Sequence, residues 1–502
     1  MEPFGQVFLI GAGPGDPGLL TLRGAELLAR ADVVLYDYLA PAELLKHCHA
    51  DCETVCLGRH GAGKLWTQTQ INERMVADAV AGKTVVRLKG GDPGIFGRLA
   101  EELAALRAAN VPYEIVPGVT TAVAAGAYAE VTLTDRDAAS CVAFVTGHEN
   151  PEKDDTLSLD FAALARFPGT LVFYMGVTTA PLWSAELIRH GLAPTTPVLI
   201  VRKCSLPTQE SIAMTLGDVA TQLAPGKMRP PLVAIVGAVS ASGVESWFTR
   251  RPLFGRTVLV TRPEHQADEL AERLTELGAR VLRQPVITIG PPEDRAAFSD
   301  AVKRATGYDW IVFSSANGVK AFFTEIAAQG LDARSLSGTQ LAAIGPATSD
   351  ALLAHGLFCD LHPEEYRAEA LADELAPLAS GKKLMLIRAS RGRDVLYQEL
   401  LSAGGLVEQT IAYRSEDVTV MRTEIATALE AGEIDWVTVT SSAIARSLVN
   451  LAGDSLERAK LVAISPLTAG VLAELGYPAA AVAEEYTSDG MVAAILKAES
   501  PR

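Results

Sequence analysis

Short apolar runs recur along the first half of the chain, and each ends in glycine or in a polar or small residue. VFLI at 7–10 ends at Gly11, and VVRL at 85–88 is followed by KGGDP. Continuous apolar runs of this length predict strands buried on both faces, which is typical of parallel sheets. The remaining runs lie at 33–36, 113–116, 142–145, 171–174, 198–201 and 232–236, with a weaker one at 54–57.

The segment between the first two runs predicts an amphipathic helix from Thr21 to Ala31. Thr21 is suited to the N-cap, and Leu22, Leu27 and Leu28 are expected on the buried side. Strands that alternate with such helices predict an α/β fold with much parallel sheet. The glycines follow the strands, so we expect them at the carboxyl edge of a sheet, where open α/β sheets bind ligands.

An internal repeat organises the second half. VLVTRP at Val258 and LMLIRA at Leu384 are 126 residues apart, and the DW segments at Asp309 and Asp435 have the same offset. Two copies at this period predict two similar α/β lobes with a ligand cleft between them. The segment TRRPLFGRT at 249–257 contains basic residues, a proline and a glycine, which predict a short linker.

Composition narrows the class of protein. A net charge of −16 disfavours a nucleic-acid partner, and an anionic ligand would need local Arg or Lys. No apolar run reaches the ~20 residues of a membrane span, and the first residues lack a secretory signal. We therefore expect a cytoplasmic protein without a membrane partner. Cys48, Cys52 and Cys56 match no metal-site spacing, so we interpret them as packing thiols and expect no metal.

The glycine loop GAGPGDPG at 11–18 looks like a dinucleotide-binding turn but departs from its pattern. Counting G-x-G-x-x-G from Gly11 puts Asp16 at the third glycine. Counting from Gly13 fits the spacing but places Pro14 and Pro17 in the loop. Proline lacks the backbone donor that a pyrophosphate cradle uses. We expect a ligand held by close backbone approach rather than by phosphates, which makes a nicotinamide enzyme the weakest alternative.

An ordered set of motifs gives the first half a specific resemblance. GAGPGDPGLLTL, VVLYD, VVRLKGGDP, FGR, VPGVTTAVAAGAYA, LTDRD, FVTGH and LVFYMG follow one another. Over about residues 5–248 the chain resembles uroporphyrinogen-III C-methyltransferases, within the tetrapyrrole (corrin/porphyrin) methylases. The resemblance implies a two-lobed, non-Rossmann α/β domain. It also implies S-adenosylmethionine as methyl donor, S-adenosylhomocysteine as product, and double methylation of uroporphyrinogen III to precorrin-2, on the route to sirohaem or cobalamin.

The resemblance also implies site residues at matching positions. Asp37 stands where the family has a proton acceptor, which is a general-base task, although a cap or turn role is the alternative. Arg59 stands where the family has a lysine regarded as proton donor. Arginine is almost never deprotonated, so carboxylate binding is the alternative for this catalytic candidate. Gly94 replaces a family phenylalanine and removes an aromatic wall. The implied cofactor contacts are Pro14, Gly90, Gly91, Asp92, Ile95, Thr120, Thr121, Met175 and Cys204.

Two of these cofactor contacts have a simpler alternative. Met175 ends an apolar strand and could be a core residue, and Asp92 could close a turn through its side chain.

The second half resembles uroporphyrinogen-III synthases over about 255–497, through VLVTRP, FSSANGV, AAIGPATSDAL and TSSA. In that family the lobes interleave, so we expect one lobe from 257–289 plus 413–502 and the other from 290–412. The implied reaction closes hydroxymethylbilane with inversion of the last pyrrole and loss of water. Tyr413 matches a tyrosine proposed to assist water loss, with packing as the alternative.

The two resemblances predict a fused bifunctional enzyme with small-molecule tetrapyrrole partners. Its boundaries are expected at 1–249, a linker at 250–256, and 257–502. We also expect a homodimer through the methyltransferase half. The alternatives are methylation of another corrin intermediate and a second half that binds tetrapyrrole without catalysis. Candidate groups for the substrate carboxylates are Arg87, Arg98, Arg136, Arg262, Ser314, Ser315, Arg388, Thr440, Ser441 and Thr468, of which the hydroxyls could equally be helix caps.

Overall fold

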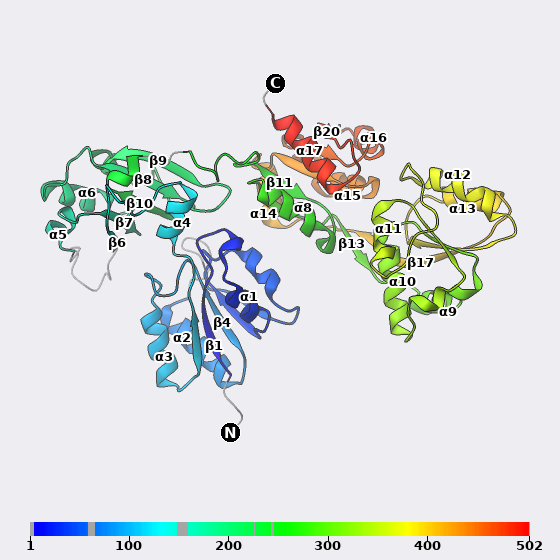
Figure 1. Ribbon diagram of the computed structural model, residues 1–502, viewed down its shortest axis with the longest axis horizontal. Coiled ribbons are helices and arrows are strands. Elements are labelled where there is room, and N and C mark those ends of the chain that lie inside the picture. Colours follow the sequence, from blue (N-terminus) through cyan, green and yellow to red (C-terminus); the bar gives the residue numbers. More distant parts are fainter. Residues whose placement is uncertain (1–4, 59–65, 148–158, 225, 242–244, 501–502) are drawn as a thin grey trace. The chain divides into compact units, whose positions relative to one another are not determined.

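The computed structural model describes residues 5–58, 66–147, 159–224, 226–241 and 245–500 (Figure 1). The fold is α/β, as predicted, and the described strands form four sheets of five strands each. The chain divides into an N-terminal unit, residues 1–256 with 274–280, and a C-terminal unit, residues 257–273 with 281–502.

The first sheet of the N-terminal unit is entirely parallel, in the order β3-β2-β4-β1-β5. Its strands are β1 (Val7–Gly11), β2 (Val33–Tyr36), β3 (Glu53–Cys56), β4 (Val85–Lys89) and β5 (Tyr113–Val116), with helices α1 (Leu22–Leu28), α2 (Gln68–Val80) and α3 (Leu99–Ala108). Side chains of β1 alternate between two cores, with Ile10 in one and Leu9 in the other. Both faces are covered, which is why the central strands read as continuous apolar runs.

The second sheet is mixed, in the order β6-β7-β10-β8-β9. Only β6 and β7 are parallel, and the other neighbours are antiparallel. Its elements are α4 (Thr121–Tyr128), β6 (Val142–Thr146), α5 (Phe161–Ala165), β7 (Thr170–Tyr174), α6 (Ala180–Arg189), β8 (Pro197–Arg202), β9 (Glu210–Thr215), α7 (Val219–Gln222) and β10 (Leu232–Val236). The sequence did not predict β9, because this edge strand is only partly buried and carries no continuous apolar run.

Helix α1 begins at the predicted N-cap but ends earlier than predicted. The Thr21 hydroxyl accepts a hydrogen bond from the backbone N–H of Gly24 at 3.1 Å. Leu27 and Leu28 are buried as expected, whereas Leu22 is 86% exposed. Five residues at about 100° each turn Leu22 by roughly 140° from Leu27. The expectation for Leu22 was therefore wrong.

The C-terminal unit holds two parallel-rich sheets, ordered β12-β11-β18-β19-β20 and β13-β17-β16-β14-β15. The chain enters the second of these through β13 and leaves through β17, and these two strands pair antiparallel. The strands are β11 (Thr257–Val260), β12 (Arg280–Arg283), β13 (Ile287–Gly290), β14 (Trp310–Phe313), β15 (Gln340–Ala343), β16 (Lys383–Ala389), β17 (Leu406–Asp417), β18 (Trp436–Val439), β19 (Lys460–Ala463) and β20 (Ala481–Val482). The helices are α8 (Glu264–Glu276), α9 (Arg295–Lys303), α10 (Ala316–Ala328), α11 (Pro346–Leu353), α12 (Ala368–Ala379), α13 (Val395–Ser402), α14 (Thr423–Glu430), α15 (Ser442–Ala452), α16 (Pro466–Glu474) and α17 (Ser488–Glu499).

The sequence repeat corresponds to equivalent positions in these two sheets. The Asp309 carboxylate accepts the backbone N–H of Lys383 at 2.9 Å, at the start of the neighbouring strand. The Asp435 carboxylate accepts the backbone N–H of Thr257 at 2.7 Å in the same way. Each aspartate therefore fixes the start of a central strand, which explains why DW recurs.

The segment expected as a linker is packed against the N-terminal unit. Leu253 is fully buried, and the ring centroid of Phe254 lies 5.4 Å from that of Phe248. Apolar side chains thus anchor a stretch whose basic residues, proline and glycine suggested only a connection.

The described residues contain neither a membrane-spanning helix nor a cluster of metal ligands. None of their helices is both long and apolar enough to cross a membrane. Their His, Cys, Asp and Glu side chains form no cluster of three or more suited to a metal ion.

Candidate functional site

Glycine loops from β1, β4 and β5 meet at the carboxyl edge of the first sheet. Gly13 and Gly91 pair through two backbone hydrogen bonds of 3.2 and 2.8 Å. A Cβ atom on Gly118 would lie 2.4 Å from the carbonyl oxygen of Gly91, and one on Gly11 would lie 2.6 Å from the Cα of Gly118. No side chain fits between backbones this close. The edge therefore presents bare backbone, as a ligand held by close approach requires.

Asp92 ties two of these loops together. Its carboxylate accepts the backbone N–H groups of Gly94 at 2.7 Å and Gly118 at 2.9 Å. The turn-closing role is therefore present. An ionised carboxylate has about four acceptor positions, so Asp92 retains capacity for a hydroxyl or amine of a ligand. The neighbouring candidates Pro14 and Ile95 are half-buried.

Hydroxyl and aromatic groups from both sheets of the unit extend this edge. The Tyr174 hydroxyl, at the end of β7, lies 2.7 Å from Oγ1 of Thr120. The rings of Phe96 and Tyr174 lie 5.1 Å apart between centroids. Met175 is 48% exposed, so the core alternative for this residue is wrong. Thr121 begins α4, and its Oγ1 would lie 3.9 Å from a Cβ on Gly91.

The prediction from sequence did not include Phe96 and Tyr174. The usable signal for Tyr174 was an aromatic residue at the last position of a buried strand, on the edge where ligands bind. Phe96 lies two residues after Gly94 and is 40% exposed. The loop after β4 therefore keeps an aromatic ring despite the glycine.

Cys204 meets the glycine loop through its backbone. Its side chain is 4% exposed, and burial raises the pKa of the thiol to about 12. Its carbonyl oxygen would lie 3.0 Å from a Cβ on Gly15, and Oγ of the adjacent Ser205 accepts the N–H of Asp16 at 2.9 Å. A contact between Cys204 and a cofactor would use the main chain.

Asp37 directly follows β2 at the same edge. Its Oδ1 accepts a hydrogen bond from Nη2 of Arg87 at 2.6 Å, and its Oδ2 accepts the backbone N–H of Gly90 at 3.3 Å. The side chain is 33% exposed. A buried cation thus holds the carboxylate while part of it reaches solvent. The other catalytic candidate, Arg59, lies outside the described residues.

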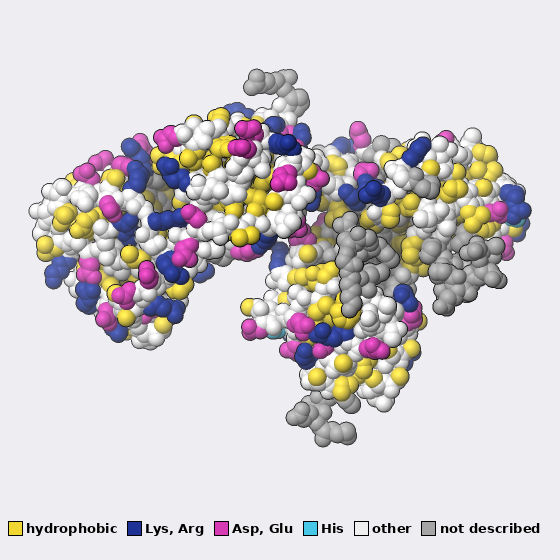
Figure 2. Space-filling model, turned by 180° about the vertical axis from the view of Figure 1, so that it is seen from behind, with side chains coloured by type: hydrophobic (Ala, Val, Ile, Leu, Met, Phe, Trp, Pro, Cys, Tyr) yellow, Lys and Arg dark blue, Asp and Glu magenta, His cyan; other side chains and the backbone are white. Residues whose placement is uncertain are grey.

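The arginines of the N-terminal unit differ in what they can bind. Arg87 is 3% exposed and directs its donors at the buried Glu102 and at Asp37, so the expectation that it binds substrate carboxylates was wrong. Arg98 is exposed and pairs with Glu101 at 2.7 Å. Arg136 is exposed. On the face drawn in Figure 2, basic and acidic side chains are interspersed, so attraction of a polyanion would be local.

Tyr413 and Ser315 meet at the carboxyl end of the sheet that contains β14, β16 and β17. Their hydroxyl oxygens are 2.9 Å apart, and the Ser315 oxygen also accepts the N–H of Gly318 at 3.1 Å, which caps α10. The Ser314 hydroxyl donates to the carbonyl of Ile387 at 3.0 Å. Tyr413 is 8% exposed, and burial raises the pKa of its hydroxyl. These three candidates lie together and also serve the fold.

Arg262 and Arg388 occupy matched positions of the repeat but have different partners. Arg388 donates to the side chains of Asp394 and Gln409, and to the carbonyl of Gly392 at 3.0 Å. Arg262 donates to the Ser488 hydroxyl at 3.1 Å, and burial lowers the pKa of its guanidinium. A desolvated cation hydrogen-bonded to a neutral group is the better candidate for a substrate carboxylate.

The hydroxyls after β18 and β19 mostly cap helices. The Ser441 oxygen accepts the N–H of Ile444 at 3.2 Å and caps α15. Thr468 is 2% exposed, with its hydroxyl 3.2 Å from that of Ser465. Thr440 is half-buried. Capping thus accounts for Ser441, and substrate contact at these positions stays a prediction.

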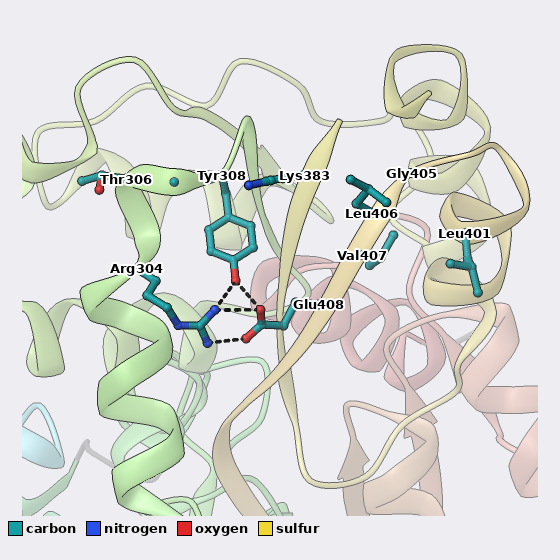
Figure 3. Close-up of a pocket in the computed structure, with 10 residues that line it drawn as sticks. Arg304, Thr306, Tyr308, Lys383, Leu401, Gly405, Leu406, Val407 and Glu408 are labelled. Atoms are coloured by element: carbon teal, nitrogen blue, oxygen red, sulfur yellow. Dashed lines mark hydrogen bonds and ion pairs between the residues drawn. The ribbon is translucent and has the colours of Figure 1, made fainter. Parts of the chain in front are cut away.

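A separate pocket of about 710 Å³ lies in the sheet that contains β14, β16 and β17, at the edge opposite to Tyr413, where β16 and β17 begin (Figure 3). Arg304 donates to Glu408 at 3.0 and 2.7 Å, and the Tyr308 hydroxyl also donates to Glu408. The Glu408 carboxylate neutralises Arg304, and Lys383 also lines the pocket. Because ligands bind at the carboxyl ends of such strands, this pocket is separate from the candidate site.

Comparison with known proteins identifies both halves. The family of Tetrapyrrole (Corrin/Porphyrin) Methylases matches residues 6–220, and the family Uroporphyrinogen-III synthase HemD matches residues 268–493. The chain is also 34% identical over 498 residues to the porphyrin biosynthesis protein HemD of Ruminiclostridium josui, which covers 98% of both proteins. The chain belongs to the tetrapyrrole methylases in its first half and to the HemD synthases in its second. Both resemblances predicted from sequence are confirmed.

Two further relatives have names of methyltransferases. The uroporphyrinogen-III C-methyltransferase of Bacillus subtilis is 37% identical over 339 residues, or 68% of this chain and 69% of that protein. A crystal structure of a uroporphyrin-III C-methyl transferase from Thermus thermophilus, complexed with S-adenyl homocysteine, is 39% identical. It covers 47% of this chain and 98% of its own, with a TM-score of 0.40.

Proposed function

We propose that the synthase half closes hydroxymethylbilane to uroporphyrinogen III and that the methylase half methylates this product twice, giving precorrin-2. The observation that carries the proposal is the presence of both families in one chain, because the product of one reaction is the substrate of the other. We assign residues 1–249 to the methylase and 257–502 to the synthase, with 250–256 between them. The synthase lobes are 257–289 plus 413–502, and 290–412.

The residues at the glycine edge fit S-adenosylmethionine, which supplies the methyl group when bound. The bare backbone of Gly90 and Gly91 leaves room for a flat or branched ligand. Asp92 offers acceptor oxygens for ribose hydroxyls or the amine, and Met175 offers an exposed apolar side chain. We place the remaining contacts at Pro14, Ile95, Thr120, Thr121 and the main chain of Cys204.

Asp37 is the proposed general base of the methylase. Each outer carbon of a uroporphyrinogen III pyrrole already carries a side chain, so a carbon that gains a methyl group from a sulfonium leaves the macrocycle positively charged. A ring nitrogen or bridging carbon must then lose a proton, and a partly exposed carboxylate beside the cofactor edge can accept it. The synthase half needs a different kind of catalysis, because its carbocation-like intermediates require positioning more than strong acids or bases. We propose that Arg262 binds a carboxylate of the substrate and that Tyr413 assists the loss of water.

The test supplies purified protein with hydroxymethylbilane, with and without S-adenosylmethionine, and separates the products chromatographically. We expect uroporphyrinogen III without the methyl donor and precorrin-2 with it. Formation of only the spontaneous type-I product would contradict synthase activity and leave a tetrapyrrole-binding module. A different methylated macrocycle would redirect the methylase to another corrin intermediate. Light scattering in the same buffer tests the expected homodimer.

A further inference from the structure

A cluster of charged side chains is buried beneath Asp37, inside the first sheet of the methylase half. Arg87 and Lys89 lie on the same face of β4, and each is 3% exposed. Glu102, from the first turn of α3, is fully buried and accepts Nε of Arg87 at 3.0 Å and Nζ of Lys89 at 2.9 Å on the same oxygen, Oε1. Arg87 thus spans from Glu102 to Asp37.

Burying this cluster inside a sheet costs desolvation free energy that apolar side chains would not. Arg87 stands in register with Leu9 and Leu35 on the neighbouring strands, which are fully buried and apolar. Buried ion pairs often contribute less stability than apolar side chains of similar volume, because both charges must be desolvated. Burial lowers the pKa of Lys89 despite its contact with Glu102. Stability alone therefore does not explain why charges stand here.

The geometry of Arg87 suggests the reason. Its Nη1 donates to the carbonyl oxygens of Leu88 at 3.1 Å and Leu35 at 3.4 Å, so the guanidinium plane is anchored by backbone on two strands. Nε is held by Glu102, and Nη2 is left to meet Asp37 at 2.6 Å. The guanidinium is rigid and planar, so its three anchors, Glu102 and the two carbonyl oxygens, fix the position of Nη2 and of the Asp37 carboxylate that it holds.

We propose that Arg87 and Glu102 are positioning residues for methylation, with Lys89 sharing the charge of Glu102. They hold the Asp37 carboxylate aimed at the substrate. The proposal rests on the proposed role of Asp37 as the base. Asp37 is faced by Arg87 and Lys89 from β4 and, behind them, by Glu102 from α3. Two cations and two carboxylates balance within this cluster.

Arg87→Met is the main test, because methionine keeps an unbranched chain of similar length without charge. We expect kcat for methylation of supplied uroporphyrinogen III to fall by about tenfold to a hundredfold, since small misplacements of a reacting group have effects of this size. The dissociation constant for S-adenosylmethionine, measured by calorimetry, should stay within about twofold, since the cluster lies below the glycine loops. The KM for uroporphyrinogen III should also stay within about twofold, because Arg87 is buried and acts on the reacting group rather than on substrate binding.

Arg23→Met provides the matched control. Arg23 forms a carboxylate pair with Glu114 at 2.8 Å in the same unit, but this pair is exposed. It should leave kcat and KM unchanged. Arg87→Lys separates charge from geometry, because one ammonium keeps the cation but cannot reach both carboxylates. We expect a lowered kcat with a KM close to that of the parent protein.

The outcomes separate two kinds of failure. If Asp37→Asn turns over normally, the proposed base is wrong. If Asp37→Asn is inactive but Arg87→Met behaves like Arg23→Met, the positioning role is wrong. If Arg87→Met and Asp37→Asn each lower the rate and their free-energy effects add in the double variant, Arg87 does not act through Asp37. Should Arg87→Met fail to fold, the kcat of Arg87→Lys decides the question, and a parent-like kcat would contradict the proposal.

Discussion

The ring of Tyr413 packs in the core and its hydroxyl lies at the candidate site, so substitution of one atom separates the two roles. Its ring belongs to the core beneath α10, whereas its hydroxyl lies at the sheet edge beside Ser315. Removing only the oxygen leaves the packing of the ring in place.

We expect Tyr413→Phe to lower the rate of uroporphyrinogen III formation by at least about tenfold, since a group that assists bond breaking typically contributes this much or more. The free energy of unfolding should fall by only about 0.5–1.5 kcal/mol, the usual net value of one hydrogen bond. Tyr308→Phe is the matched control, because the Tyr308 hydroxyl bonds to Glu408 at the opposite edge of the same sheet. Equal synthase rates in the two variants would assign Tyr413 to packing.

The cysteines provide a pH-dependent prediction. Burial raises the pKa of Cys48 and of Cys204 to about 12, whereas Cys56 is exposed. A raised pKa means less thiolate at any pH below it, and thiolate is the form that reacts with iodoacetamide. At pH 8 we expect mass spectrometry to find Cys56 labelled first in the folded protein and Cys48 and Cys204 essentially unlabelled. Unfolding in denaturant should remove the difference, and early labelling of Cys204 would contradict its burial.

The sequence predicted which residues lie at strand ends, but not which buried side chains contact them. Asp37 and Gly91 follow recognisable apolar runs, so their edge position was predictable. Arg87 was predicted to bind substrate because the substrate carboxylates require basic residues nearby. Its actual partner, Glu102, lies on a helix whose rotation against the sheet depends on packing across the whole layer. The local pattern does not encode that rotation.

At the level of elements, the loops after β1, β4 and β5 behave as one structure. Gly118→Ala should disturb all of them, because its Cβ would lie 2.4 Å from the carbonyl oxygen of Gly91. We expect a clear drop in melting temperature together with at least tenfold weaker binding of S-adenosylmethionine, measured by calorimetry, because roughly 1.4 kcal/mol of lost contact corresponds to tenfold.

Gly470→Ala is the control for that substitution. Gly470 lies in α16, and a Cβ there would meet nothing within 4 Å. Alanine in a helix interior is favoured over glycine by about 1 kcal/mol, so the melting temperature should rise or stay unchanged. Gly118→Ala with parent-like stability and cofactor affinity would show that the loops can move apart.

Element prediction worked where burial is symmetric. The central strands of the first sheet are covered on both faces, and β2 among them has the bounds that its apolar run predicts. Edge strands such as β9 and one-sided helices such as α1 depend on neighbours that a local window does not contain. For the same reason, the antiparallel pairing of β10 with β7 and β8 was not visible in the sequence.

At the scale of the whole molecule, the two proposed activities use residues in different units of the chain. Asp37 and its partners lie in the N-terminal unit, and Tyr413 lies in the C-terminal unit. Asp37→Asn should therefore retain synthase activity, and Tyr413→Phe should retain methylation of supplied uroporphyrinogen III.

An equimolar mixture of these two variants should form precorrin-2 from hydroxymethylbilane and S-adenosylmethionine, because uroporphyrinogen III made by one chain can diffuse to another. Chromatography of the products over time measures the rate. A mixture that accumulates uroporphyrinogen III without methylating it would show that the intermediate must pass within one chain.

In the C-terminal unit, the strands of one sheet, β13 to β17, lie in sequence between β12 and β18 of the other. This order determines when each sheet can be completed on the ribosome. Thr257 of β11 and its partner Asp435 are separated by 178 residues. At about 5–20 residues per second, translation of that interval takes roughly ten to forty seconds. The inserted sheet, β13 to β17, is synthesised within this time and can close first. Until β18 emerges, one edge of β11 lacks its neighbour, so the nascent chain exposes an apolar strand edge of the kind that chaperones bind.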